Sequence, residues 1–225
     1  MKKLFLLILL SVSLLPLAAQ TAREVLISLP DSLMPLLPVK SRHDMLDFLD
    51  NKMEAKVRNR LNDYVCLDTL TEDYFRLSLS EAAETERRIL RTEDSLSVIC
   101  LVHTVGTSIR DSRAAFYDNE WHLLYWLKLP NPSTEDFFSM EKNESDSLSV
   151  SSNIVATDTR DWEWMQRSIN DLRFVEITIA PDAPVFTFTL SVEPLAEEEK
   201  KLALRYVRPL QYRWTGNDFM VMPSH

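Results

Sequence analysis

The chain has 225 residues, a formal charge of −9 and a mean hydropathy of −0.15. An acidic surface repels phosphate backbones and anionic headgroups, so we expect neither a nucleic-acid-binding nor a membrane-surface protein. Gly106 and Gly216 are the only glycines. Because phosphate-binding loops, dinucleotide turns and nucleophile elbows depend on glycine, the composition also argues against those sites.

Residues 1–19 have the pattern of a secretory signal peptide. Lys2 and Lys3 precede an apolar run from Leu4 to Leu17 that is short for a membrane span, and Ala19 suits signal peptidase. Cleavage before Gln20 would remove the two lysines and move the formal charge from −9 to −11. No cysteine follows the run as a lipid attachment point, so we expect an exported protein in the periplasm or cell envelope, without membrane insertion after cleavage. An uncleaved anchor is the alternative.

Residues 20–130 predict a first unit of one helix and an antiparallel meander. Residues 24–29 suit a short strand or an extended lead-in, and a helix is expected from Ser41, with Asp44 completing a capping box and an apolar stripe reaching Val57. Short alternating segments then predict strands at 64–70, 73–80, 86–92, 96–105, 112–117 and 120–126. The segment 96–105 is the most continuously apolar, which is typical of a central strand covered on both faces.

Residues 131–158 predict a linker, whose acidic loop at 141–153 has little apolar content and should be mobile. A second unit at 159–225 follows, with a helix at 161–172. Its expected strands are 173–180, 185–192, 201–208, 210–215 and 218–222. Two hairpin patterns, Thr69–Ser80 and Thr178–Ser191, resemble each other. The predicted fold class is therefore α+β, with a helix plus antiparallel β-meander repeated twice in tandem.

Cys66 and Cys100 both lie in apolar, strand-like runs. Export permits a disulfide between them, whereas two buried thiols in neighbouring strands would behave as small apolar side chains. The sequence leaves both alternatives open.

No group of residues predicts catalysis, a cofactor or a metal site. The four histidines (His43, His103, His122 and His225) are scattered without ligand spacing. Cys100 and His103 would point to opposite sides of one strand and so could not form a nucleophile–base pair. Carboxylates at Asp68, Glu72, Asp73 and 197–199 are interpreted as solvated turn residues.

Tryptophans give the remaining functional signal. Trp162 and Trp164 diverge by roughly 200° on the expected helix, so they cannot both face one core. The segment 120–127 has large apolar groups on both faces. Packing inside the protein is the simpler explanation. As candidate binding residues we take Trp121, Trp126, Trp162, Trp164 and Trp214. The predicted function is a non-catalytic binding module for an envelope protein or a polymer such as a glycan, and the alternative is a periplasmic hydrolase of glycan or peptide that uses carboxylates.

The chain also resembles a known family over most of the expected mature protein. The residues that carry the resemblance are Leu29–Pro38, Asp44–Asp50, Leu70–Tyr74, Cys100–Val105, Asp111–Arg113 and Phe116-Tyr117. They are similar to the family of domain of unknown function 3256, exported proteins of Bacteroidales-type bacteria. The resemblance implies export and an envelope setting. It implies no activity and supplies no functional residues.

Overall fold

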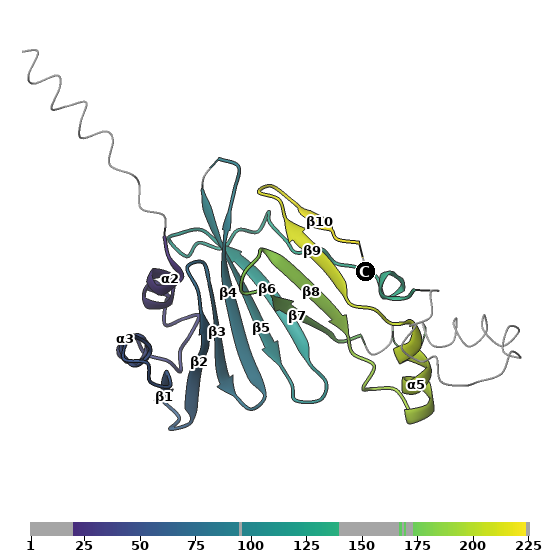
Figure 1. Cartoon of the computed structure of the whole chain (residues 1–225), viewed down its shortest axis with the longest axis horizontal. Coiled ribbons are helices and arrows are strands. Elements are labelled where there is room, and N and C mark those ends of the chain that lie inside the picture. The colour runs from purple at the N-terminus through teal and green to yellow at the C-terminus, as the bar shows by residue number, and fades with distance from the viewer. Residues whose placement is uncertain (1–19, 95, 140–166, 168, 170–172, 224–225) are drawn as a thin grey trace, which may run out of the picture.

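The computed structural model of the protein describes residues 20–94, 96–139, 167, 169 and 173–223, which form two antiparallel sheets and several helices (Figure 1). The first sheet has the strand order β1-β2-β3-β4-β5-β6 and the second has the order β10-β9-β8-β7. The strands of the first sheet are β1 Lys56–Arg58, β2 Tyr64–Leu70, β3 Tyr74–Ser80, β4 Ala83–Arg91, β5 Ser97–Val105 and β6 Asp111–Tyr117. Those of the second are β7 Val175–Ile179, β8 Val185–Leu190, β9 Leu210–Trp214 and β10 Phe219–Val221.

Two of the helices, α2 Ala22–Ser28 and α3 Val39–Asp50, cover part of one face of the first sheet. The structure also describes the 3-10 helix η1 Glu135–Phe137 and α5 Glu197–Tyr206. Figure 1 shows α2 and α3 beside β1 to β3. Apolar residues of these helices, such as Val25, Leu26 and Met45, form one core with Phe75 and Ile89 of the sheet. We call this face of the first sheet its helix side.

The second sheet packs against the other face of the first. Val102 and Phe116 form a second core with Ile177, Phe186 and Trp214. β5 supplies Ile99 to one core and Cys100 to the other, so its first half is covered on both faces, as its continuous apolar run predicted, whereas Leu101 and His103 are half-buried and Val105 is exposed. The α+β class with antiparallel sheets is confirmed. In the part of the chain that the structure describes, no helix is long and apolar enough to cross a membrane.

Two predictions for the N-terminal part were wrong. Residues 24–29 belong largely to α2, where Thr21 and Glu24 form a capping box that accounts for the helix start. Helix α3 begins at Val39 rather than Ser41 and ends at Asp50. Val57, expected on the helix stripe, instead lies in β1, a strand that the sequence did not predict.

Two predicted strands do not form. Residues 201–208 fall mainly in α5, whose buried Ala203 and Tyr206 recur at helical spacing after three glutamates in the first turn. The segment 120–126 contains a single bridge, between Leu123 and Tyr117. The tandem repeat of the helix-plus-meander plan is therefore not confirmed. The acidic loop at 141–153 lies outside the described residues, and of the helix at 161–172 only Arg167 and Ile169 are described, both helical.

The two cysteines are free thiols. They lie in β2 and β5, which are separated by two strands rather than being neighbours. Three strand spacings amount to roughly 14 Å, twice the longest Cα separation that a disulfide normally spans.

Candidate binding surface

Side chains of the first sheet protect the exposed edge of β7. This strand pairs with β8 on one side only, so alternate N–H groups on its other side lack a backbone partner. They donate to the first sheet instead: Val175 to Asp111 Oδ1 at 3.2 Å, Ile177 to Ser112 Oγ at 2.9 Å and Ile179 to Glu86 Oε2 at 2.9 Å. The two sheets are thus joined by a polar seam as well as by the apolar core.

Glu86 is enclosed in this seam. Its side chain accepts hydrogen bonds from the hydroxyl of Tyr74 at 2.6 Å and from the backbone of Ile179, and the residue is only 2% exposed. Burial raises the pKa of Glu86 despite these hydrogen bonds. Burial, followed by the hydrogen bond to Glu86, also raises the pKa of Tyr74. Glu86 therefore acts as a structural acceptor beneath β7.

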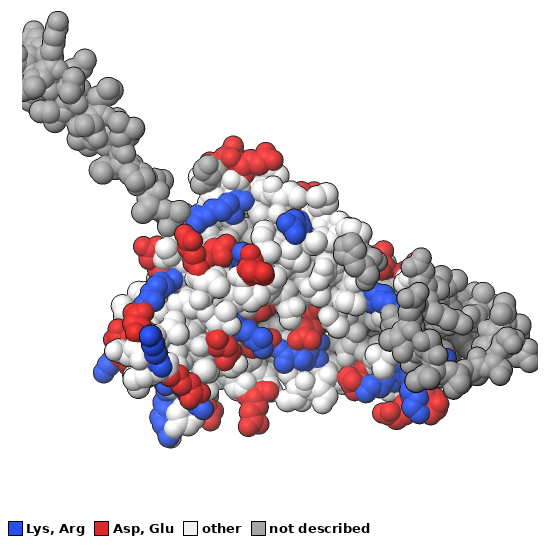
Figure 2. All heavy atoms as spheres, in the orientation of Figure 1, with Lys and Arg blue, Asp and Glu red and all other residues white. Residues whose placement is uncertain are grey.

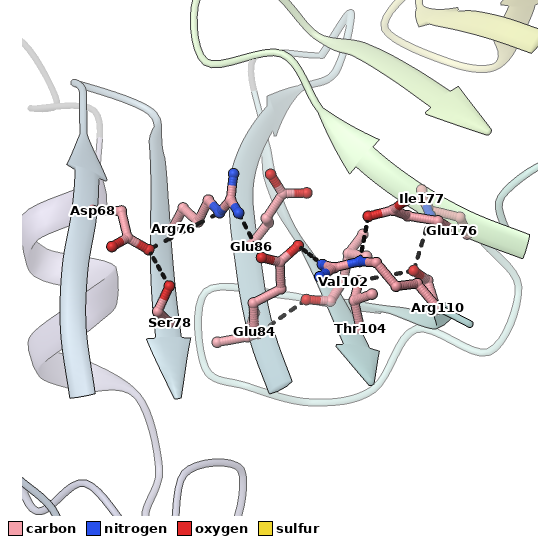
Figure 3. Close-up of polar contacts among 12 residues, drawn as sticks. Asp68, Arg76, Ser78, Glu84, Glu86, Val102, Thr104, Arg110, Glu176 and Ile177 are labelled. Carbon is pink, nitrogen blue, oxygen red and sulfur yellow. Dashed lines mark hydrogen bonds and ion pairs between the residues drawn. The ribbon is translucent and has the colours of Figure 1, made fainter. Parts of the chain in front are cut away.

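A charged cluster lies next to Glu86 on the same face (Figure 3). We define it as Asp68, Arg76, Glu84, Arg110 and Glu176. Glu84 pairs with Arg76 at 2.6 Å and with Arg110, and Arg110 reaches Glu176 of β7 at 2.6 Å. Figure 2 shows acidic and basic side chains interleaved near the centre of the visible face. The cluster links the first sheet to β7 and neutralises most of its own charge.

Glu84 and Glu86 are spaced like the two carboxylates of a catalytic acid–base pair. They occupy alternate positions of β4, roughly 7 Å apart along the strand, in different environments, as paired catalytic carboxylates often do. However, Glu84 is only 6% exposed and held by two guanidinium groups, and Glu86 lies under β7. Neither carboxylate lines the open hollow of about 270 Å³ beside Trp214 or the one of about 230 Å³ beside Arg173. The arrangement therefore serves the seam, and we assign it no reaction.

The predicted tryptophans lie in different environments. Trp214 is 6% exposed, donates Nε1–H to the carbonyl of Arg91 at 2.7 Å and packs on Phe219, so it belongs to the core between the sheets. Trp162 and Trp164 lie outside the described residues. Trp121 is half-buried and Trp126 is 71% exposed. Trp121 and Trp126 therefore both lie in the segment that follows β6, whereas Trp214 lies in the core between the sheets.

Trp121, Tyr125 and Trp126 form what we call the aromatic turn. After β6 the chain reverses where the carboxylate of Asp118 accepts the backbone N–H groups of Glu120 at 2.9 Å and His122 at 2.8 Å. Leu127 then anchors the segment in the core between the sheets. Between these fixed points Tyr125 and Trp126 point outward, 79% and 71% exposed.

The sequence signalled part of this surface. Tyr125 was visible beside Trp126 but was not among the candidate residues. The charged cluster was missed, although the unbroken polar run Glu84-Thr85-Glu86-Arg87-Arg88 in a strand is unusual and indicates buried polar pairing. Among the described residues, no three His, Cys, Asp or Glu side chains gather in an arrangement that could hold a metal ion.

Comparisons with known proteins identify a family without an activity. The model of the family described as "Protein of unknown function (DUF3256)" matches residues 14–219, so the chain belongs to this family. The chain is similar to a solved structure described as a domain of an uncharacterized protein from Porphyromonas gingivalis W83. The TM-score is 0.68 at 25% identity, over 89% of this chain and 96% of that one. A search of curated proteins finds no significant match.

Proposed function

We propose that this member of the DUF3256 family is a non-catalytic binding protein of the cell envelope that contacts an envelope protein or polymer through its aromatic turn. The exposure of Tyr125 and Trp126 supports the proposal most directly. Two neighbouring aromatic side chains at a turn leave large apolar area in water, which is typical of contact sites. The signal-peptide pattern of residues 1–19 supports the envelope setting.

The alternative of a carboxylate-dependent hydrolase has weaker support. Its acid and base would have to come from carboxylates brought together across strands, and the charged cluster is where such residues meet. There, Glu84 is neutralised by Arg76 and Arg110, and Glu86 is enclosed by Tyr74 and β7. A substrate would have to displace β7 to reach Glu86, so we do not favour this reading.

Co-sedimentation with a washed envelope fraction tests the proposal. Trp126→Ala should weaken the apparent affinity for the envelope fraction roughly 30-fold, since truncating a central tryptophan of an interface costs about 2 kcal/mol or more. The unfolding free energy should change by no more than about 0.5 kcal/mol, because the side chain is exposed.

Leu61→Ala is the matched control. Leu61 is also a large exposed apolar residue, but it precedes β2, toward the opposite edge of the first sheet from β6. This variant should bind as the wild type does. Equal retention of wild type, Trp126→Ala and Leu61→Ala would overturn the proposed function.

A further inference from the structure

The helix side of the first sheet is only partly covered by helices. The core under α2 and α3 draws mainly on β1 to β4, and residues on β5 and β6 that face the same way are more exposed. Leu101, His103, Ala115 and Tyr117 are half-buried, and Val105 and Arg113 are exposed. The pairs Leu101–Ala115 and His103–Arg113 are directly opposite in the ladder, so these side chains share one face. We call these six residues the strand shelf.

The shelf is positively charged within an acidic protein. The guanidinium of Arg113 forms no hydrogen bond or ion pair with the described part of the chain. Arg87 of β4 lies opposite Leu101, is 2% exposed and has no partner for its Nε–H. Burial, and then the charge of Arg87, lower the pKa of His103, so the positive charge resides on the two arginines. Asp111 is the ladder partner of Val105, but its carboxylate accepts the backbone N–H of Val175 in the second sheet, so none of the six shelf residues is acidic.

The shelf continues into the aromatic turn. The ring of Tyr117 lies 5.8 Å from that of Trp121, whose Nε1–H donates to Ser28 Oγ of α2 at 3.3 Å. The backbone bridge between Tyr117 and Leu123 holds the aromatic turn at the end of β6. The aliphatic side chains of the strand shelf, the guanidinium of Arg113 and the rings of the aromatic turn therefore form one continuous surface.

We propose that the strand shelf and the aromatic turn together bind a protein segment in which a carboxylate stands between apolar side chains. This inference rests on the proposed function and specifies the partner's chemistry. Tyrosine, tryptophan and arginine over apolar side chains are the typical composition of protein interface centres. A carboxylate is the natural partner for the planar guanidinium of Arg113. A sugar chain is less well matched, because no shelf residue offers the carboxylate or carboxamide that usually binds hydroxyl groups.

Selection from a displayed library of random 12-residue peptides tests this partner chemistry. The library is selected on the wild-type protein after depletion on the Arg113→Gln variant, and binding of synthetic peptides is measured by fluorescence anisotropy. Selected peptides should carry Asp or Glu flanked by apolar residues. Asp→Asn or Glu→Gln in the peptide, or Arg113→Gln in the protein, should weaken binding about tenfold or more, since a charge-assisted hydrogen bond contributes about 1.5–3 kcal/mol. Arg113→Lys should retain part of the affinity, because it keeps the charge but loses the two-pronged geometry.

Three outcomes would overturn the inference. Selected peptides could lack acidic residues, they could bind Arg113→Gln as well as wild type, or polygalacturonate could bind in an Arg113-dependent way while no peptide does. The proposed function fails separately: retention on the envelope fraction would then be insensitive to Trp126→Ala. Retention that depends on Trp126 but not on Arg113 would contradict the carboxylate partner and leave the binding function standing.

Discussion

Replacing Arg87 by methionine should raise the free energy of unfolding by about 1–3 kcal/mol. Burial, and then the charge of Arg42, lower the pKa of Arg87 from its ordinary value to about 9. At about 1.4 kcal/mol per pH unit, keeping this guanidinium charged at neutral pH costs on the order of 5 kcal/mol. Its compensation is small: one hydrogen bond to Thr85 Oγ1 at 3.1 Å and a contact 5.4 Å from the centre of the Phe75 ring. Together these offset about 2–3 kcal/mol.

Methionine suits the site because it is unbranched and apolar. Thr85 keeps a partner in the variant, since its hydroxyl also donates to the carbonyl of Val102 at 2.9 Å. Replacing buried charged groups by apolar ones of similar size is often stabilising by about 1–4 kcal/mol. Urea unfolding at pH 7, followed by circular dichroism, measures the difference.

Arg88→Met is the control, because Arg88 is the next residue of β4, is 3% exposed and points to the other face. Its guanidinium pairs with Asp73 at 3.0 Å and donates to the carbonyl of Ala180 at 2.6 Å. Removing it should cost about 3 kcal/mol, since both partners lose their cation. A loss of stability in Arg87→Met as large as that in Arg88→Met would refute the reasoning and indicate a partner for Arg87.

The pH dependence of the Arg87→Met effect provides a second check. Because the pKa of Arg87 is lower in the folded state than in the unfolded chain, the unfolded chain binds more protons above about pH 9. The wild type therefore gains stability as the pH rises above that value. The variant lacks this gain. Its advantage over the wild type should be constant below about pH 9 and shrink above it.

Three further predictions concern other buried or strained positions. Burial raises the pKa of Glu86, so just above the ordinary carboxyl pKa range the folded state binds more protons than the unfolded chain. The free energy of unfolding of the wild type should therefore fall as the pH rises through that range. Glu86→Gln should flatten this fall in a series of urea-unfolding measurements between pH 4 and 7. Gly106→Ala should cost about 2 kcal/mol or more in the same assay, because φ is +110° and a Cβ atom would lie 1.8 Å from the carbonyl oxygen of Ile109. A thiol assay without reductant should find two reactive groups after unfolding and, in the native protein, little reaction at Cys66 and none at the fully buried Cys100; an unfolded protein without free thiols would contradict it.

The sequence predicted best the elements that local rules determine. The hairpin at 69–80 forms as β2–β3 and the hairpin at 178–191 forms as β7–β8, because turn residues and period-two alternation agree within each segment. Prediction failed where the segment was short or its pattern ambiguous. Helix α2 has seven residues, and α5 carries Leu202, Leu204 and Tyr206 at strand-like spacing within a sequence of strong helix formers.

The polar seam could not be predicted from local rules. Glu84 and Glu176 meet through Arg110 only because the second sheet stacks on the first, and residues 92 positions apart carry no mutual signal in one sequence. Similarly, β4 alternates poorly because both of its faces are buried. The exposure of Tyr125 and Trp126 depends on where Leu127 is anchored, which is also a property of the assembled core.

The way the sheet edges are protected favours contact through side chains over strand addition. The β1 edge has three residues and carries Lys56 and Arg58, and short, charged edges discourage pairing with another strand. The β6 edge meets β7 at its start, and near its end the carbonyl of Phe116 accepts the backbone N–H of Leu124 at 2.8 Å. A partner that added a strand at the first sheet would have to displace these contacts. A partner on the helix side would meet the guanidinium of Arg113 and the exposed rings without breaking a hydrogen bond among the described residues. Binding to the face of the sheet therefore costs less than adding a strand at its edge.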